Sequence, residues 1–238
     1  MMASVSGKVA LVAGGTGGLG RAVSLAFLEE GANVVVTFRT PDEFARLATS
    51  AGENAPRLEG RNVDVTREPA SRELVEFVVG RHGKLDVLVN TVGGYGGGKL
   101  QEQDEKLLDK MLDLNLRSGF ALARAAVPVM IRQGQGAIVN VASKAAIEHA
   151  AGVASYAASK AAALALFDSL AEELKGTGVR VNTILPSIID TEANRKAMPA
   201  ADFSKWPKPE EIARVVLFLS SDDAKAIHGA AIPVYGHR

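Results

Sequence analysis

The stretch "VALVAGGTGGLGRA", residues 9–22, says most about the architecture of this chain. Five apolar residues lead into a glycine-rich turn, where Gly14, Gly18 and Gly20 stand in a G-x-x-x-G-x-G spacing just before a helical pattern begins. Small residues at a strand-to-helix turn allow backbone N–H groups and a helix N-terminus to approach a pyrophosphate. Such a turn can also be purely structural, but its place after the first strand favours nucleotide binding.

Beyond this turn, short β-branched runs alternate with longer amphipathic runs along the whole chain. The pattern predicts strands at residues 9–13, 33–38, 57–63, 85–90, 137–141, 179–185 and 231–234. It predicts helices at residues 18–30, 42–50, 68–81, 104–132, 153–175 and 209–220. This alternation indicates βαβ units with right-handed crossovers and a parallel sheet covered by helices on both faces. The 238 residues contain no linker or repeat, so we expect a single domain, 1–238.

The composition narrows the class of partner. Lys and Arg together number 27, as do Asp and Glu, so the overall charge does not favour nucleic acid or an anionic membrane. The absence of cysteine removes disulfides and zinc-thiolate sites and fits a cytoplasmic protein. The four histidines lack metal-ligand spacing, and the first apolar segment is too short for a signal peptide or a membrane span. We therefore expect a small-molecule substrate and no metal.

The residues after the second predicted strand bear on the choice of nucleotide. An acid at this point normally binds the ribose 2′-hydroxyl of NAD, whereas an arginine suits a 2′-phosphate. Here the chain reads Thr37, Phe38, Arg39, Thr40, with no acid. This favours NADP(H) over NAD(H), with Arg39 as the phosphate partner, although Arg39 could also simply end an exposed strand. Asp64, after the third strand, could accept from an adenine amino group or serve equally as a helix N-terminal acid.

The strongest chemical signal lies in "VASKAAIEHAAGVASYAASK", residues 141–160. Tyr156 and Lys160 are one helical turn apart and share a face. An ammonium group nearby stabilises a phenolate, so we expect Lys160 to lower the pKa of Tyr156 from about 10 and make it a general acid or base. Ser143 could donate a hydrogen bond to a substrate carbonyl oxygen. A lone Tyr and Lys at this spacing could be a surface pair, but Ser143 and the glycine loop favour catalysis.

These motifs, in this order, resemble the short-chain dehydrogenase/reductase family over essentially the whole chain. The resemblance rests on the glycine loop, Asp64, "NTVGG" from Asn90, Asn115, Ser143, Tyr156, Lys160 and "PSIIDT" from Pro186. It implies a Rossmann-like doubly wound α/β fold with strand order 3-2-1-4-5-6-7, hydride transfer with a nicotinamide cofactor, and a homotetramer or homodimer. It also implies that Asn115 holds a water beside Lys160 in a proton relay.

The resemblance, together with the residues discussed above, assigns a set of cofactor contacts. They are Gly14, Thr16, Gly18, Leu19, Gly20, Arg39, Asp64, Val65, Asn90, Gly93, Tyr156, Lys160, Pro186, Ile189 and Thr191.

Residues 188–211, "IIDTEANRKAMPAADFSKWPKPEE", form an unusually long segment without sustained periodicity. We expect residues 188–208 to be a substrate lid. The segment is similar to the corresponding part of dihydropteridine reductases, although those enzymes usually carry an acid after strand two and lack the serine retained here as Ser143. The candidate substrate contacts are Tyr95, Ser143, His149, Phe203 and Trp206, because aromatic rings could stack on a flat heterocycle. Alternatively, Phe203 and Trp206 pin the lid to the domain.

The sequence therefore predicts an NAD(P)H-dependent reductase, with NADPH favoured, acting on a C=O or C=N group of a small molecule. One alternative is dihydropteridine reductase-like reduction of a quinonoid dihydropterin. A second alternative is a non-catalytic nucleotide-sensing regulator, since a fold does not by itself fix a function. The presence of Ser143, Tyr156 and Lys160 together argues against the regulator.

Overall fold

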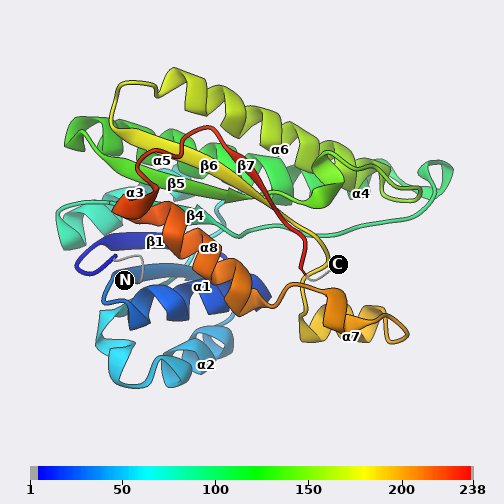
Figure 1. The fold of residues 1–238 in the computed structure, drawn as a ribbon, viewed down its shortest axis with the longest axis horizontal. Coiled ribbons are helices and arrows are strands. Elements are labelled where there is room, and N and C mark those ends of the chain that lie inside the picture. Colours follow the sequence, from blue (N-terminus) through cyan, green and yellow to red (C-terminus); the bar gives the residue numbers. More distant parts are fainter. Residues whose placement is uncertain (1–4, 237–238) are drawn as a thin grey trace.

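The computed structural model describes residues 5–236 and contains one seven-stranded sheet (Figure 1). The strands are β1 Val9–Ala13, β2 Asn33–Phe38, β3 Leu58–Asn62, β4 Val87–Asn90, β5 Gly136–Val141, β6 Val179–Pro186 and β7 Ala231–Val234. They lie in the order β3-β2-β1-β4-β5-β6-β7, and every neighbouring pair is parallel. The predicted strand order is confirmed.

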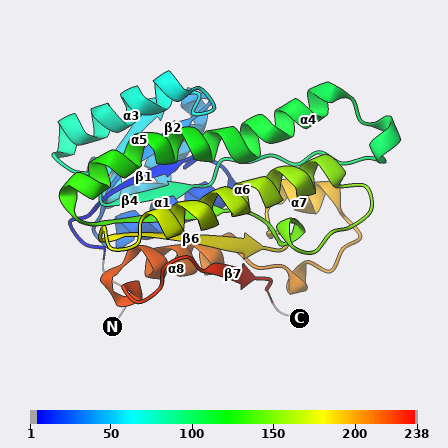
Figure 2. The same ribbon diagram turned by 90° about the horizontal axis from the view of Figure 1, so that it is seen from above.

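Helices cover both faces of this sheet (Figures 1 and 2). On one face, α1 Gly18–Glu29, α2 Pro41–Ala51 and α8 Pro209–Ser220 contribute to one hydrophobic cluster. On the other face, α3 Glu68–His82, α5 Ser118–Gln133 and α6 Ala154–Glu173 contribute to a second. All residues of β1 and β4 are buried, as expected for parallel strands covered on both sides.

The helix predicted at residues 104–132 is interrupted. The structure has α4 Glu105–Leu112, then a π-helical turn Asp113–Arg117, and then α5. The helical path is continuous, as Figure 2 shows, so the apolar pattern was interpreted correctly, but the wider turn that contains Asn115 was missed. Such turns frequently occur at functional sites.

The lid segment, which shows no periodicity in the sequence, contains a short helix, α7 Glu192–Ala197. Thr191 starts it, because its side-chain oxygen accepts from the backbone N–H of Asn194 at 3.2 Å. The ion pair of Lys196 with Glu192, one turn apart, supports it at 2.6 Å. A helix of six residues is too short to leave an amphipathic pattern, and local capping stabilises it instead.

The topology determines where a site can lie. All seven strands point the same way, so their carboxyl ends form one edge of the sheet, and the order reverses between β1 and β4. Ligands of such sheets bind at the carboxyl edge beside this reversal. Across residues 5–236, no helix is long and apolar enough to cross a membrane.

Candidate active site

The glycine loop between β1 and α1 forms the first wall of the site. Gly14 has φ of +73°, and its N–H donates to Thr37 Oγ1 at 2.8 Å, which ties the loop to β2. A Cβ on Gly20 would lie 2.0 Å from the carbonyl oxygen of Gly14, so no side chain fits there. A Cβ on Gly18 would lie 2.9 Å from Thr191 Cγ2. The structure thus brings the predicted glycines and Thr191 of the lid together at the start of α1.

The second wall contains an acid that sequence reasoning missed. Arg39 follows β2 as predicted, and its side chain is exposed. Glu43, in the first turn of α2, accepts a hydrogen bond from Thr16 Oγ1 at 3.2 Å. Glu43 therefore brings a carboxylate to the glycine loop, although no acid follows β2 directly. The signal was the acidic start of α2, which was interpreted only as helix-forming sequence.

The residues after β3 make a local turn. Asp64 is exposed, and its Oδ1 accepts from the N–H of Thr66 at 3.1 Å and from its Oγ1 at 2.7 Å. Val65 is buried in the cluster beneath α3. Asp64 therefore orders the chain just before α3, at the same sheet edge as the glycine loop.

The end of β4 supports the loop that follows it. Asn90 is buried, its Nδ2 donates to Asn140 Oδ1 at 3.2 Å, and its Oδ1 accepts from the N–H of Val92 at 3.3 Å. Gly93 is exposed, and a Cβ there would lie 3.0 Å from Asn115 Oδ1 and 3.1 Å from Lys160 Nζ. The predicted residues Gly93, Asn115 and Lys160 therefore meet at one point.

Asn115 lies in the π-helical turn and is held by hydrogen bonds to the loop after β4 and to α6. Its Oδ1 accepts from the N–H of Gly94 at 2.9 Å, and its Nδ2 donates to the carbonyl of Gly94 and to Ser159 Oγ, each at 3.0 Å. Ser159 in turn donates to the carbonyl of Tyr156 at 2.8 Å. Sequence reasoning missed Ser159, which fixes Asn115 against α6; the only signal was a polar residue on the Tyr156 helix.

Tyr156 and Lys160 project from one face of α6, as predicted. Lys160 is buried, and its Nζ donates to the carbonyl of Val141 at 3.1 Å. Burial without a carboxylate partner lowers the pKa of Lys160 to about 8. Ser143, two residues after β5, accepts from the N–H of Ala145 at 3.1 Å through its Oγ, and it lies close enough to the phenol of Tyr156 to lower its pKa.

The expected lowering of the Tyr156 pKa is wrong for this structure. Burial of the phenol raises its pKa above the ordinary value, while the nearby Ser143 side chain works in the opposite direction and the Tyr95 phenol adds to the increase. The physical reason is that burial disfavours the phenolate, and the ammonium of Lys160 is directed to the carbonyl of Val141. Tyr156 is thus a protonated phenol at neutral pH.

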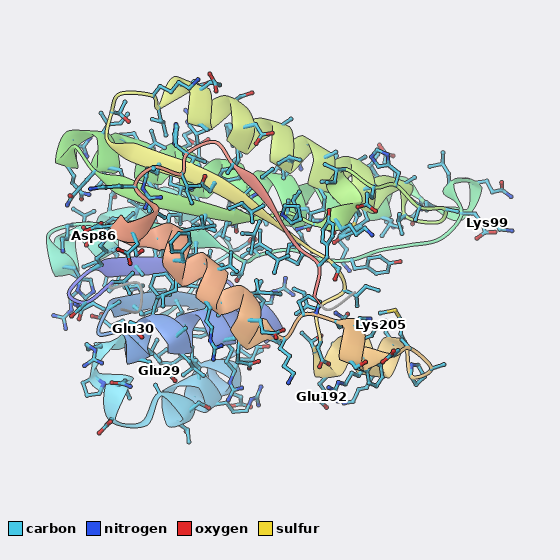
Figure 3. All side chains as sticks on the ribbon, in the orientation of Figure 1. Glu29, Glu30, Asp86, Lys99, Glu192 and Lys205 are labelled. Carbon is cyan, nitrogen blue, oxygen red and sulfur yellow. The ribbon has the colours of Figure 1, made fainter. Side chains whose placement is uncertain are left out.

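The predicted substrate residues fall into separate groups. Tyr95 lies in the segment between β4 and α4, whose part near Lys99 projects beyond the body (Figure 3). Tyr95 is 68% exposed and packs edge-on against Tyr156, with ring centroids 5.1 Å apart. His149 is exposed on the loop before α6. Phe203 and Trp206 instead pack on each other, with centroids 5.0 Å apart, and Trp206 is only 8% exposed. These contacts agree with the alternative in which the two rings pin the lid.

The two ends of the lid are joined near Pro186, the last residue of β6. The N–H of Asp190 donates to the carbonyl of Pro207 at 2.9 Å, and Asn194 Nδ2 donates to the carbonyl of Ile189 at 2.8 Å. Ile189 and Thr191 thus leave the carboxyl edge of β6 in a fixed turn, beside the glycine loop.

Comparison with known proteins agrees with this geometry. The sequence model of the short chain dehydrogenase family matches residues 8–202. The chain is 34% identical over 240 residues to a 3-oxoacyl-acyl-carrier-protein reductase, FabG, of Thermotoga maritima, with 98% of each chain covered. This likeness extends across nearly the whole of both proteins.

Two solved structures are similar throughout. L-sorbose reductase from Gluconobacter frateurii, complexed with NADPH and L-sorbose, has a TM-score of 0.90 and 29% identity, covering 100% of this chain and 98% of that one. Carveol dehydrogenase from Mycobacterium avium, in complex with NAD, has a TM-score of 0.90 and 26% identity, with 99% of both chains covered. With its parallel sheet, glycine loop and Ser143, Tyr156 and Lys160 side chains, this chain belongs to the short-chain dehydrogenase/reductase family of oxidoreductases.

Proposed function

We propose that this protein is a cytoplasmic reductase that uses NADPH in preference to NADH and reduces a C=O or C=N group of a small molecule. The observation that carries the proposal is the arrangement of three side chains: Tyr156 lies beside Ser143, and Lys160 is buried on the same face of α6. A nucleotide-sensing regulator would have no use for this arrangement.

The described residues fit a nicotinamide dinucleotide. Gly18 and Gly93 are exposed and leave the backbone open to a ligand, and Thr191 lies at the start of α1, where a pyrophosphate is favoured. When bound there, the cofactor supplies the hydride. Lys160, beside Gly93, would contact the nicotinamide ribose.

The phenol of Tyr156 supplies the proton. A raised pKa keeps it protonated at neutral pH, as a general acid for reduction requires. As hydride reaches the substrate carbon, electron density moves to the carbonyl oxygen or imine nitrogen, which takes the proton from Tyr156. Ser143 orients that atom, and the ammonium of Lys160 and a water held by Asn115 return a proton to the phenolate.

The preference for NADPH rests on Arg39 and the absence of an acid after β2. Glu43 beside Thr16 acts against it, because a carboxylate repels a 2′-phosphate. Arg39→Asp should therefore weaken NADPH binding much more than NADH binding, and Glu43→Gln should strengthen NADPH binding. Equal losses for both nucleotides in Arg39→Asp, measured by fluorescence titration, would remove Arg39 from the phosphate site.

A second candidate activity is the reduction of a quinonoid dihydropterin. The supporting observation is Tyr95, an exposed ring packed edge-on against Tyr156, which could stack on a flat heterocycle. Steady-state rates with NADPH and NADH against quinonoid dihydropterin, β-ketoacyl thioesters, quinones and simple ketones separate the two activities. Tight cofactor binding without any turnover across this panel would favour the regulator instead.

We further propose that the protein acts as a homodimer or homotetramer. The observation is a set of exposed apolar side chains on α4 and α5: Leu108, Phe120 and Ile131 are 39, 45 and 44% exposed. Such side chains on adjoining helices are typical of a subunit contact. Light scattering on the purified protein gives its mass, and a monomer would contradict the proposal.

A further inference from the structure

A second concave region lies at the opposite edge of the sheet, formed where the strands begin. It has a volume of about 590 Å³. Its lining comes from the residues just before β1 and β4, from the first residues of β5 and β6 with the turns before them, and from the segment between α8 and β7. In Figure 3, Asp86 of this region and Glu192 and Lys205 of the lid lie toward opposite ends of the molecule. This volume is in the range of small-molecule sites, which span about 300–1,000 Å³.

The lining is strongly basic, although the chain as a whole carries equal numbers of acidic and basic residues. Among the described residues, its charged side chains other than histidine are Lys8, Lys84, Lys175, Arg180, Lys225, Asp86 and Asp222. These five cations face only two carboxylates. The cavity is therefore a local positive region in a protein with no net charge.

Both aspartates are already paired with lysines. Asp86 is buried, accepts from the N–H of Val9 at 2.8 Å, and pairs with Lys84 at 2.8 Å. Asp222 pairs with Lys8 at 2.7 Å. These two pairs neutralise two of the cations and explain how the cluster is tolerated at the edge of the sheet.

The remaining cations are only partly compensated. The Asp222 carboxylate, already paired with Lys8, also attracts Arg180 and Lys225, so one carboxylate is shared among three cations. The guanidinium of Arg180 donates to the carbonyl oxygens of Ser221 at 2.9 Å and Ile227 at 3.4 Å, which orient it without neutralising it, and its partial burial lowers its pKa. Lys225 is exposed and, within residues 5–236, forms no ion pair. Lys175 pairs with Glu172 at 2.5 Å, outside the lining.

We propose that this cavity binds a small phosphorylated metabolite, with Arg180 and Lys225 as its main contacts to the phosphate. A phosphate ester carries nearly two negative charges and three acceptor oxygens. It can therefore contact both the oriented guanidinium of Arg180 and the exposed ammonium of Lys225, and it suits two cations better than a carboxylate ligand does. Gly176 also lines the cavity, and a Cβ there would meet nothing within 4 Å, so the wall is open at this point. The site is separate from the nucleotide loop, which lies at the other edge of the sheet.

The test uses inorganic pyrophosphate as the probe. Calorimetric titration is performed on the full chain saturated with NADP⁺, so that the glycine loop is occupied. We expect saturable binding of one pyrophosphate per chain that weakens with added salt, because the contact is ionic. Binding that appears only without NADP⁺ would place the probe at the glycine loop and overturn the proposal.

Two variants locate the binding. Lys225→Gln removes an exposed charge and should weaken pyrophosphate binding about fivefold, as expected for one screened contact between charges. Lys99→Gln is the matched control, because Lys99 is also an exposed lysine but lies on the projecting loop at the far end of the molecule (Figure 3). If both variants lose affinity for pyrophosphate equally, or if neither loses it, the proposed site is contradicted.

Arg180→Gln should weaken binding further, but it also removes two hydrogen bonds within the fold. Amide hydrogen exchange on the unmodified protein avoids that difficulty. Pyrophosphate should slow exchange at residues 174–180 and 222–229 and leave residues 14–20 unchanged in the presence of NADP⁺. Cosedimentation with phosphatidic acid vesicles, without binding of soluble pyrophosphate, would assign the surface to lipid and overturn the assignment to a metabolite.

Discussion

Lys160 and Arg195 are both cations close to the proposed substrate path, yet they are held in opposite ways. Lys160 is buried, and its Nζ donates to the backbone carbonyl of Val141 in the core of the domain. Arg195 is half exposed. Its Nε donates to Asp190 Oδ1 at 2.5 Å and its Nη2 donates to Asp190 Oδ2 at 2.7 Å, and its guanidinium lies over the ring of Phe203. The catalytic cation is thus buried in the packed fold, whereas the lid cation is half exposed, although the side chain of its partner Asp190 is only 7% exposed.

This difference has energetic consequences. Removing one partner of a buried hydrogen bond leaves the other unsatisfied and costs about 1–3 kcal/mol. Exposed ion pairs contribute only about 0–1 kcal/mol. We therefore expect substitutions in the centre to impair chemistry and stability together, and substitutions in the lid to alter mainly substrate affinity.

The largest expected effect is that of Tyr156→Phe. It removes the proton donor but keeps the ring against Tyr95, so kcat should fall about 10²–10⁴-fold while the Kd for NADPH stays unchanged. Steady-state and fluorescence titrations measure the two quantities. Tyr95→Phe also loses a phenolic hydroxyl group, but it should reduce kcat far less than Tyr156→Phe does. A Tyr156→Phe enzyme with an unaltered rate would exclude the proposed mechanism.

Asparagine occurs in both regions and allows a matched comparison. Asn115→Ala leaves both backbone groups of Gly94 and the hydroxyl of Ser159 without their partner, and should lower the free energy of unfolding by about 2–3 kcal/mol. Asn194→Ala in the lid loses one hydrogen bond to Ile189 and should cost under about 1 kcal/mol. Urea unfolding compares them, and similar costs would refute the proposed difference between centre and lid.

Lys160 should also make stability depend on pH. Its pKa is about 8 in the folded protein and near 10.5 when unfolded, so between these values the unfolded chain binds more protons. The free energy of unfolding attributable to Lys160 therefore rises as the pH increases from about 8 to 10, by on the order of 2 kcal/mol. Lys160→Met should abolish this rise in urea unfolding without cofactor. A rise that persists in Lys160→Met must come from another group.

The smallest effect is expected for Arg195→Gln in the lid. It removes the ion pair with Asp190, whose pKa the hydrogen bonds from Arg195 hold below its usual range. We expect KM for the substrate to rise a few-fold and kcat to stay within about twofold. Loss of kcat with KM unchanged would show that the lid takes part in chemistry.

Much of the fold could be predicted from the sequence because its determinants are local. Most strands are short runs rich in apolar residues, with β3 as the polar exception, and Gly14, Gly18 and Gly20 mark the first turn. Tyr156 and Lys160 were found because a helix places residues four apart on one face. Such a pattern needs several turns of helix, and the six residues of α7 in the lid are too few to show one.

The properties that the sequence did not predict depend on distant residues. Glu43 reaches the glycine loop only because α2 packs beside α1, and Ser159 matters only because Asn115 lies against it. The direction of the Tyr156 pKa shift follows from burial and from the orientation of Lys160, and neither can be derived from spacing. Proximity in the sequence therefore identified the groups but not their electrostatics.

The π-helical turn at Asp113–Arg117 has a consequence for protein engineering. A π-helical turn accommodates one residue more than an α-helical turn, so deleting a single residue there would convert α4 and α5 into one regular helix. The amide of Asn115 would then be rotated away from Gly94 and Ser159, while the packing of both flanking helices would be largely retained. The extra residue of the π-helical turn is thus needed to orient Asn115 but not to pack α4 and α5.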